Sequence, residues 1–336
     1  MTNPVLVEVS RGSRVESQHR GSYAVVDAKG GIVASAGDID APVFPRSAVK
    51  AFQAIPLFES GAADKYQLTD AEIALCVASH SGEPEHAATA AGILKKAGLD
   101  KDALECGAHW PMGDAATRAL AAQHEEPTAL HNNCSGKHSG FLCFACAADY
   151  DPKGYVGRTH PVQREIKIVC EAMTGATLGD EVCGTDGCSI PTYAAPLRGI
   201  AQGFAKLGTG YGLEPQRADA ARRIFKAVAA HPFMVAGTGR FDTDAMNILR
   251  ERVFMKTGAE GVYCAAFPEL GYGIALKIDD GATRASQAVM EALIAKFLPL
   301  DDETKAKLRA LGEPQLKNWN GMTVGAVNPT ELLKAV

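Results

Sequence analysis

Residues 21–36 read GSYAVVDAKGGIVASA, two largely apolar runs on either side of a glycine-containing connection. The runs Gly21–Asp27 and Ile32–Ala36 are typical of β-strands, and Lys29-Gly30-Gly31 suits a tight hairpin turn between them. Just upstream, Pro4–Val9 reads as a further strand. The chain is therefore predicted to open with an antiparallel sheet.

The C-terminal part also predicts sheet, whereas the middle is mostly helical. Val262–Ala266 and Gly271–Ile278 are typical of a hairpin, and Met322–Val327 of a last strand. Thr69 and Glu72 form a capping box ahead of an apolar run. The expected helices are Ser47–Ser60, kinked at Pro56, then Pro84–Lys96, Gly113–Gln123, Lys137–Ala148, Pro161–Thr174, Tyr193–Leu207, Pro215–Ala230, Ser286–Phe297 and Asp301–Leu311.

This order of elements favours an α+β fold, in which an antiparallel sheet built from both termini carries an inserted helical lobe. We expect a single domain over residues 1–336 with two lobes. The sheet lobe would comprise residues 1–60 and 240–336, and the mainly helical lobe residues 61–239 or thereabouts.

Composition argues against several classes of protein. The 336 residues carry a formal net charge of −5, which argues against a nucleic-acid partner because phosphate binding needs a basic face. No apolar run reaches the roughly 18 residues of a membrane span, and no signal-peptide pattern is visible. We therefore expect a cytoplasmic protein without a membrane partner. The nine cysteines, an odd number, do not suggest a disulfide framework.

The first candidate for chemistry is Pro45-Arg46-Ser47-Ala48-Val49-Lys50, a Ser-x-x-Lys pattern at the start of a predicted helix. Its spacing puts the serine and the lysine on one helix face. A serine hydroxyl needs a nearby base to become a nucleophile, and a neutral lysine amine can be that base. The bland alternative is an N-capping serine followed by a solvated lysine.

Two further segments support catalysis. Met255-Lys256-Thr257-Gly258 contains Lys-Thr-Gly, and Ser79-His80-Ser81-Gly82 follows a predicted apolar helix. The order of Ser-x-x-Lys, a serine-containing loop and Lys-Thr-Gly is similar to that of the serine penicillin-recognising hydrolases. The central motif departs from their Ser-Asp-Asn, and Lys-Thr-Gly alone could be a surface turn. Together the three indicate two hydroxyls and two amines around one carbonyl.

Two glycine-punctuated loops carry cysteines. His131–Gly140 includes Cys134, and Cys183–Ser189 includes two more cysteines. Thiolates from different loops could bind Zn²⁺. The spacing matches no common zinc finger, so two buried cysteines in glycine turns remain the alternative, with His138 as a structural residue.

At this point the motifs resemble a known family, the Rhizobium-type, or class 3, L-asparaginases. The resemblance covers essentially the whole chain. It rests on the segments Asn3–Gly12 with Val15-Glu16-Ser17, Pro45-Arg46-Ser47-x-x-Lys50, Ser79-His80-Ser81-Gly82-Glu83, His131-Asn132-x-Cys134-Ser135-Gly136-Lys137-His138 and Gly184-x-Asp186-Gly187-Cys188. It implies a fold like the serine β-lactamases and glutaminases, a homodimer, and hydrolysis of the small molecule L-asparagine to L-aspartate and ammonia.

The resemblance also implies roles for individual residues, each carried over by motif match. Ser47 would be the nucleophile with Lys50 beside it, and Ser79 would pair with a second lysine, which we place at Lys256. A zinc site would lie close to the serines. Its implied ligands are Cys134, Lys137 and Cys188, and the carboxylate of Asp186 would support them. The implied substrate contacts are Arg46 and His138. An arginine suits the substrate α-carboxylate because its donors form a fork.

Two other functions remain open from sequence. A serine amidase, esterase or β-lactamase-like acyl hydrolase would share the Ser-Lys chemistry but would need a wider and more apolar cleft. In a binding or regulatory protein that holds zinc, the cysteine loops would bind the metal and the serines would have no catalytic role. Ammonia release from asparagine separates the first alternative from the asparaginase, and covalent trapping of Ser47 separates the second.

Overall fold

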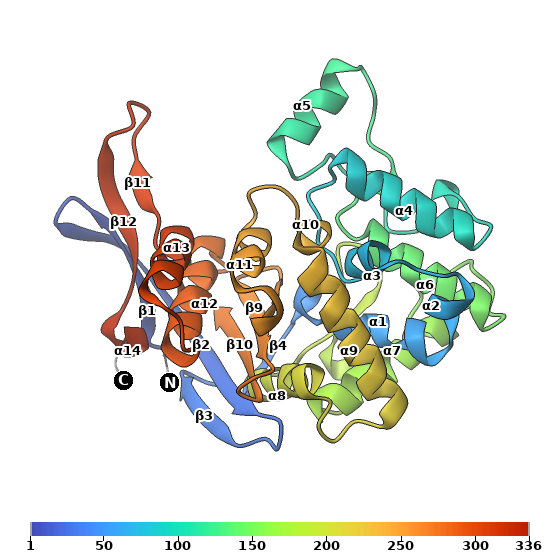
Figure 1. Ribbon diagram of the computed structural model, residues 1–336, viewed down its shortest axis with the longest axis horizontal. Helices are drawn as coiled ribbons and strands as arrows, with labels where there is room; N and C mark the ends of the chain where they lie inside the picture. The colour runs from blue at the N-terminus through green and yellow to red at the C-terminus, as the bar shows by residue number, and fades with distance from the viewer. Residues whose placement is uncertain (1, 335–336) are drawn as a thin grey trace.

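The computed structural model describes residues 2–334. A twisted antiparallel sheet occupies one side of the molecule and a group of helices the other (Figure 1). The strand order is β11-β12-β1-β2-β10-β9-β8, with β3 paired to β2. The strands are β1 (Val5–Arg11), β2 (Arg14–Asp27), β3 (Ile32–Ala36), β8 (Phe254–Thr257), β9 (Val262–Phe267), β10 (Tyr272–Ile278), β11 (Gln315–Lys317) and β12 (Thr323–Pro329).

The two ends of the chain meet in the centre of this sheet. Val9 of β1 is paired with Val327 of β12, and Val25 of β2 with Ile274 of β10. The long strand β2 pairs with β1 through its first half and with β10 and β3 through its second half. The predicted α+β class, with an antiparallel sheet built from both termini, is confirmed.

Helices cover both faces of the central strands. Helix α8 (Leu197–Thr209) packs on β10, β9 and β2, and α12 (Thr283–Phe297) also contacts β9 and β10. Every residue of β9 is buried, as expected for a strand that is covered on both faces. A Cβ at Gly273 would lie 1.9 Å from the carbonyl oxygen of Ala201. Glycine is therefore required where α8 crosses β10.

The remaining helices gather around α1 (Lys50–Glu59), which contacts four of them and is buried from Lys50 to Phe58. The group comprises α2 (Ala62–Lys65), α3 (Asp70–Cys76), α4 (Pro84–Lys96), α5 (Asp114–Ala122), α6 (Ser135–Ala147), α7 (Pro161–Thr174), α9 (Pro215–Ala230) and α10 (Pro232–Val235). On the sheet side lie α11 (Phe241–Leu249), α13 (Asp302–Gly312) and α14 (Glu331–Lys334). Two small two-stranded sheets complete the structure. In one, β4 (Pro42–Val43) pairs with the distant β7 (Ala195–Pro196), and in the other β5 (Cys183–Thr185) pairs with β6 (Pro191–Tyr193).

Several local predictions are confirmed, and two segments differ from what was expected. The Thr69–Glu72 capping box and both predicted hairpins are present. Tyr193 was expected to open a helix but lies in β6, because Pro196 delays the helix start to Leu197. The alternative of a surface turn for Lys-Thr-Gly does not hold, since Lys256 and Thr257 belong to the edge strand β8. The segment that forms α11 had no predicted element.

The Ser-x-x-Lys segment also differs in detail from the expected helix. Residues Arg46–Val49 form a short 3₁₀ helix, η1, and the α-helix begins only at Lys50. The division into two lobes at fixed boundaries stays a prediction. Among residues 2–334, no helix combines the length and the apolar character that crossing a bilayer requires.

One buried carboxyl in the sheet half gives a stability prediction. Glu291 on α12 lies under Gly312, and burial, with Glu313 nearby, raises its pKa to about 7. A raised folded-state pKa means that the native state holds a proton which the unfolded chain releases near its ordinary pKa. The contribution of protonated Glu291 to the free energy of unfolding is therefore complete at acidic pH, and it is lost as the pH rises through about 7.

We expect Glu291→Gln to raise the free energy of unfolding at pH 8 by about 2–3 kcal/mol, at about 1.4 kcal/mol per pKa unit. At pH 5 the gain should nearly vanish. Urea unfolding of both proteins at the two pH values checks this. Glu303→Gln, at an exposed position of α13, is the matched control. Parallel pH dependences of wild type and Glu291→Gln would contradict the account.

Candidate active site

A buried lysine amine lies at the centre of the predicted site. Lys50 is 1% exposed. Its Nζ donates hydrogen bonds to Ser79 Oγ at 2.9 Å and to the carbonyl oxygen of Ala78, and lies 3.1 Å from Cys134 Sγ. Burial lowers the pKa of Lys50, although the Cys134 thiolate opposes this. The folded chain thus joins two motifs, Ser-x-x-Lys and the serine loop, through one hydrogen bond.

Ser47 lies in η1, the turn that leads into Lys50, and is half-buried. Its hydroxyl makes no hydrogen bond with any of the residues 2–334. The serine that Lys50 binds is therefore Ser79, and the Ser47 hydroxyl has no competing partner. The residue before it, Arg46, has a φ of 52°, a left-handed conformation that costs a non-glycine residue about 1 kcal/mol or more.

Arg46 is held in place by Asp186 from the turn between β5 and β6. The guanidinium donates to the Asp186 carboxylate at 2.6 Å. Burial alone would raise the pKa of Asp186, but the hydrogen bond from Arg46 and the positive charge of Lys137 hold it below its usual range. A charged pair therefore fixes the conformation of the backbone next to Ser47.

The two cysteine loops meet next to Lys50. Cys134 precedes the first turn of α6, Lys137 lies one turn later, and Lys137 Nζ donates to Cys188 Sγ at 3.0 Å. The hydrogen bond from Cys188, together with Lys50, outweighs burial and holds the pKa of Cys134 well below its usual range. The same hydrogen bond, and then burial, raises the pKa of Cys188. The sulfur atoms of Cys134 and Cys188 and the amine of Lys137 are therefore gathered in one buried cluster.

This donor set can be tested against a metal. Two thiols and a nitrogen suit Zn²⁺, a borderline-soft ion. Within residues 2–334, no three His, Cys, Asp or Glu side chains gather at one point, so the set depends on the amine of Lys137. That amine must lose its proton to bind, and burial favours the loss, but the interactions with Cys188 and Cys134 reverse this and raise the pKa of Lys137. The set fits zinc if binding displaces that proton.

His138, the next residue along α6, is also fully buried. Its Nδ1 lies 2.7 Å from the Tyr155 hydroxyl, whereas its Nε2 has no partner. Burial, followed by the charge of Lys137, lowers the pKa of the imidazole well below its usual range, so the ring is neutral. An unpartnered buried nitrogen is uncommon in folded proteins, and it leaves His138 able to bind one further group.

The Lys-Thr-Gly segment reaches the site from the sheet. A Cβ at Gly258 would lie 2.6 Å from the carbonyl oxygen of Pro45, so this end of β8 abuts η1. Lys256 is fully buried, and burial lowers its pKa to about 7, with Asp242 opposing and the charge of Lys50 adding to the effect. Its Nζ donates to the carbonyl oxygen of Thr257 at 2.9 Å. Among the described residues, no hydrogen bond joins Lys256 to Ser79, the partner expected for it.

Two positioning groups were missed by motif reasoning. Asp242, buried in α11, accepts a hydrogen bond from the Thr257 N–H at 2.9 Å and so anchors the end of β8. His80 lies 2.9 Å from Ser135 Oγ and accepts from the Gly82 N–H, which ties the serine loop to α6. Burial keeps the pKa of His80 well below its usual range. Asp242 has no local spacing pattern that would have marked it, whereas His80 lies inside the motif Ser79–Glu83 but had no role assigned.

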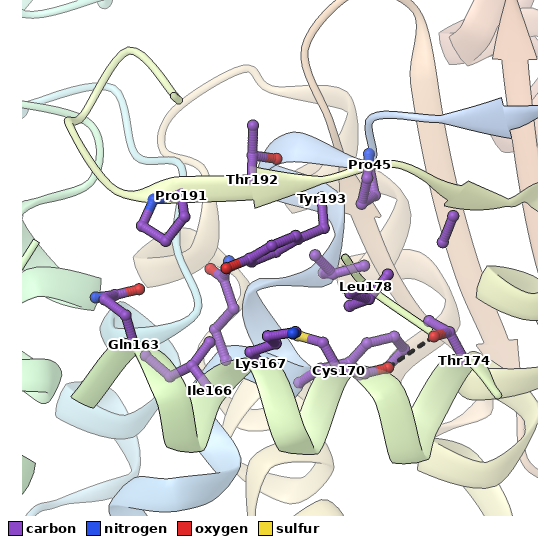
Figure 2. A pocket seen from close by; sticks show the side chains of 14 residues that line it. Pro45, Gln163, Ile166, Lys167, Cys170, Thr174, Leu178, Pro191, Thr192 and Tyr193 are labelled. Carbon is purple, nitrogen blue, oxygen red and sulfur yellow. Dashed lines mark hydrogen bonds between the residues drawn. The ribbon is translucent and has the colours of Figure 1, made fainter. Parts of the chain in front are cut away.

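Two cavities adjoin η1. The first lies between α7 and β6, where Figure 2 shows Tyr193 and Thr192 above the helix that carries Gln163 and Cys170. Its volume is about 20 Å³, room for about one water molecule, so it does not suit an amino acid. The second cavity, of about 230 Å³, is lined by Arg46 itself.

Comparison with known proteins bears on the whole chain. The family described as L-asparaginase II matches residues 7–329. No curated protein matches the sequence. Among solved structures, a mutant of simvastatin synthase (LovD) from Aspergillus terreus is similar with a TM-score of 0.41 and 12% sequence identity, over 77% of this chain and 86% of that chain. A β-lactamase from Mycobacterium bovis is similar with a TM-score of 0.39 and 13% identity, over 82% of this chain and 94% of that chain.

Structural similarities as distant as these two say nothing about the activity of this chain. The family match is different, because it runs from residue 7, within β1, to the end of β12 and so includes the serine, lysine and cysteine motifs. The chain therefore belongs to the L-asparaginase II family.

Proposed function

We propose that this amide hydrolase is an L-asparaginase, which converts L-asparagine to L-aspartate and ammonia through Ser47. One observation carries the proposal. A fully buried lysine amine, that of Lys50, is bonded to Ser79 and lies in the turn after Ser47, whose hydroxyl has no partner among residues 2–334. The family supplies the substrate class, a small-molecule amide.

The first chemical step forms an ester. Ser47 Oγ attacks the carbon of the side-chain amide, and its proton passes to the Lys50 amine. The backbone N–H of Ser47 is the proposed donor to the oxyanion that develops. Arg46 and the unpartnered Nε2 of His138 are the proposed substrate contacts.

Departure of ammonia needs a proton on the amide nitrogen. The hydrogen bond of 2.9 Å between Lys50 and Ser79 offers the route, from the lysine through the serine hydroxyl to the leaving nitrogen. Lys256 is the proposed second amine of this relay, and it must leave the Thr257 carbonyl to reach Ser79. The carbon–nitrogen bond then breaks, and water hydrolyses the ester and returns the proton to Ser47.

Zinc is the proposed metal of the neighbouring donor set, with Cys134, Lys137 and Cys188 as ligands and Asp186 in support. A bound Zn²⁺ would fix the two cysteine loops and orient the substrate, and none of the steps above passes through it. These residues also hold Arg46 through Asp186, so loss of the metal should change substrate affinity more than the chemical step.

We expect Cys188→Ser to weaken zinc binding by at least about 100-fold, because a thiolate ligand is replaced by a poor donor. Equilibrium dialysis with zinc analysis measures the affinity directly. Cys146→Ser, at a half-buried cysteine of α6, is the matched control and should bind as the wild type does. Equal zinc affinity in all three proteins would remove the proposed site.

The test of the proposed activity is ammonia release from L-asparagine and L-glutamine, with and without added zinc, next to ester and β-lactam hydrolysis. We expect ammonia release from asparagine and no hydrolysis of the ester or the β-lactam. Ester or β-lactam hydrolysis without ammonia release would instead favour the acyl hydrolase. The homodimer and the cytoplasmic location stay predictions, and light scattering of the purified protein checks the first.

A further inference from the structure

The cavity beside Arg46 is built by segments from distant parts of the chain. It is lined by Phe44 after β4, Arg46 of η1, Gly184 of β5, Glu260 of the turn after β8, and Lys277 of β10. Its volume is about 230 Å³, enough for a small polar molecule of several heavy atoms. The neighbouring cavity in Figure 2 lacks both this space and these charges.

Groups of opposite charge line this cavity, and Lys277 and Glu260 form no ion pair with each other. Lys277 donates to the carbonyl oxygen of Ile278, which leaves two of its three N–H donors unused. Arg46 uses one edge of its guanidinium for Asp186 and remains 28% exposed. Within residues 2–334, neither Lys277 nor Glu260 takes part in an ion pair. A cation and an anion that line one cavity without an ion pair, beside an arginine that is partly exposed, suit a ligand that carries both signs of charge.

The backbone of this cavity is held in an unfavourable conformation. Seven non-glycine residues among those described have positive φ, and two of them, Arg46 at 52° and Glu260 at 55°, line this cavity. Such conformations persist where the surrounding structure imposes them, often at ligand sites. Glu260 lies next to Gly281, where an added Cβ would come within 2.8 Å of its Oε2. Glu260 is exposed, so a ligand in the cavity can reach it.

The cavity also adjoins the turn that carries Ser47, because Arg46 lines it and is the residue before Ser47. In asparagine the amide carbon is only two bonds from Cα, so a group that holds the α-ammonium or the α-carboxylate must lie close to the nucleophile. Arg46 is the residue before Ser47, and Gly258 abuts Pro45 on the other side. A ligand anchored here would present its side-chain amide toward η1.

From these observations we infer that Lys277 and Glu260 determine specificity for the zwitterionic end of the substrate. Lys277, with Arg46, binds the α-carboxylate, and Glu260 binds the α-ammonium. This inference rests on the proposed asparaginase function and adds two residues that no motif indicates. Both residues bind substrate and neither reacts, so their effects should depend on which α-group the substrate carries.

Truncated substrates separate the two contacts. Succinamate lacks the α-ammonium group of asparagine, and 3-aminopropanamide lacks the α-carboxylate. We expect Lys277→Met to lower kcat/KM at least about 10-fold on asparagine and on succinamate, mainly through KM, but less than about 3-fold on 3-aminopropanamide. For Glu260→Gln the pattern should be crossed, with the loss on asparagine and 3-aminopropanamide and little on succinamate.

Matched controls are Lys226→Met and Glu303→Gln at exposed positions of α9 and α13. Losses that are equal on all three substrates, or absent, would overturn the inference. A wild-type protein without ammonia release would overturn the proposed function instead. In that case, titration calorimetry with L-aspartate, succinate and 3-aminopropanoate tests the inference separately from the activity. Weaker binding of succinate by Lys277→Met and of 3-aminopropanoate by Glu260→Gln supports the inference, and the absence of this pattern in Kd rejects it.

Discussion

Ser47→Ala is expected to lower kcat for ammonia release from L-asparagine by at least about 10⁴-fold, the loss typical when a nucleophile is removed. The reason is chemical, because no ester can form without the hydroxyl. The structural cost should be small, since the Ser47 side chain makes no hydrogen bond with any described residue. Steady-state kinetics and thermal unfolding of the variant check both statements.

Ser60→Ala is the matched control for this variant. Ser60 follows the last turn of the same helix, α1, and its hydroxyl donates only to the carbonyl oxygen of Leu57. It should keep wild-type kinetics. If Ser47→Ala turned over asparagine at more than about one-tenth of the wild-type rate, the proposed ester intermediate would be untenable.

Lys50→Met is expected to have the next largest effect, a fall in kcat of about 10³-fold, within the range for general-base groups. Methionine keeps most of the buried volume but removes the amine that joins Ser79 to the site. The fold should survive, because the Cys134 thiolate, which lies 3.1 Å from the amine, can take up a proton once the positive charge is gone. Circular dichroism and thermal unfolding test that point.

Lys50→Arg separates a base from a mere charge. A guanidinium keeps the positive charge but cannot accept a proton at accessible pH, so this variant should be as inactive as Lys50→Met. Substantial activity in Lys50→Arg would show that the site needs only a cation there. Lys226→Met, at an exposed position of α9, provides the control for lysine replacement and should remain active.

Much of the fold followed from local patterns. The hairpins β2–β3 and β9–β10 were predictable because turn glycines separate apolar runs of strand length. The short strand β8 was not, because its four residues, with a lysine among them, resemble a turn until burial against β9 is known. The strand β6, in place of the expected helix start at Tyr193, depended on pairing of Tyr193 with Cys183, which the residues around Tyr193 do not indicate.

The candidate site was predictable only in its residue types. Spacing and motif order marked the serines and lysines, but which serine Lys50 contacts depends on how α1 and the segment after α3 pack together. Asp242 carries no pattern, since its role comes from one backbone N–H of β8. Glu260 and Lys277 face one cavity because two turns and a strand converge there. Such convergence leaves no local trace in a sequence.

The most direct test of the central claim, that Ser47 forms the ester, is covalent labelling. A diazoketone analogue of asparagine, with the reactive group in place of the side-chain amide, alkylates the attacking residue irreversibly, and tryptic peptide mass spectrometry locates the label. Cleavage after Arg46 and after Lys50 would release the segment Ser47–Lys50. We predict that loss of activity parallels one label in this segment, on Ser47. A label on Ser79 or Cys134, or full inactivation with Ser47 unmodified, would contradict the account.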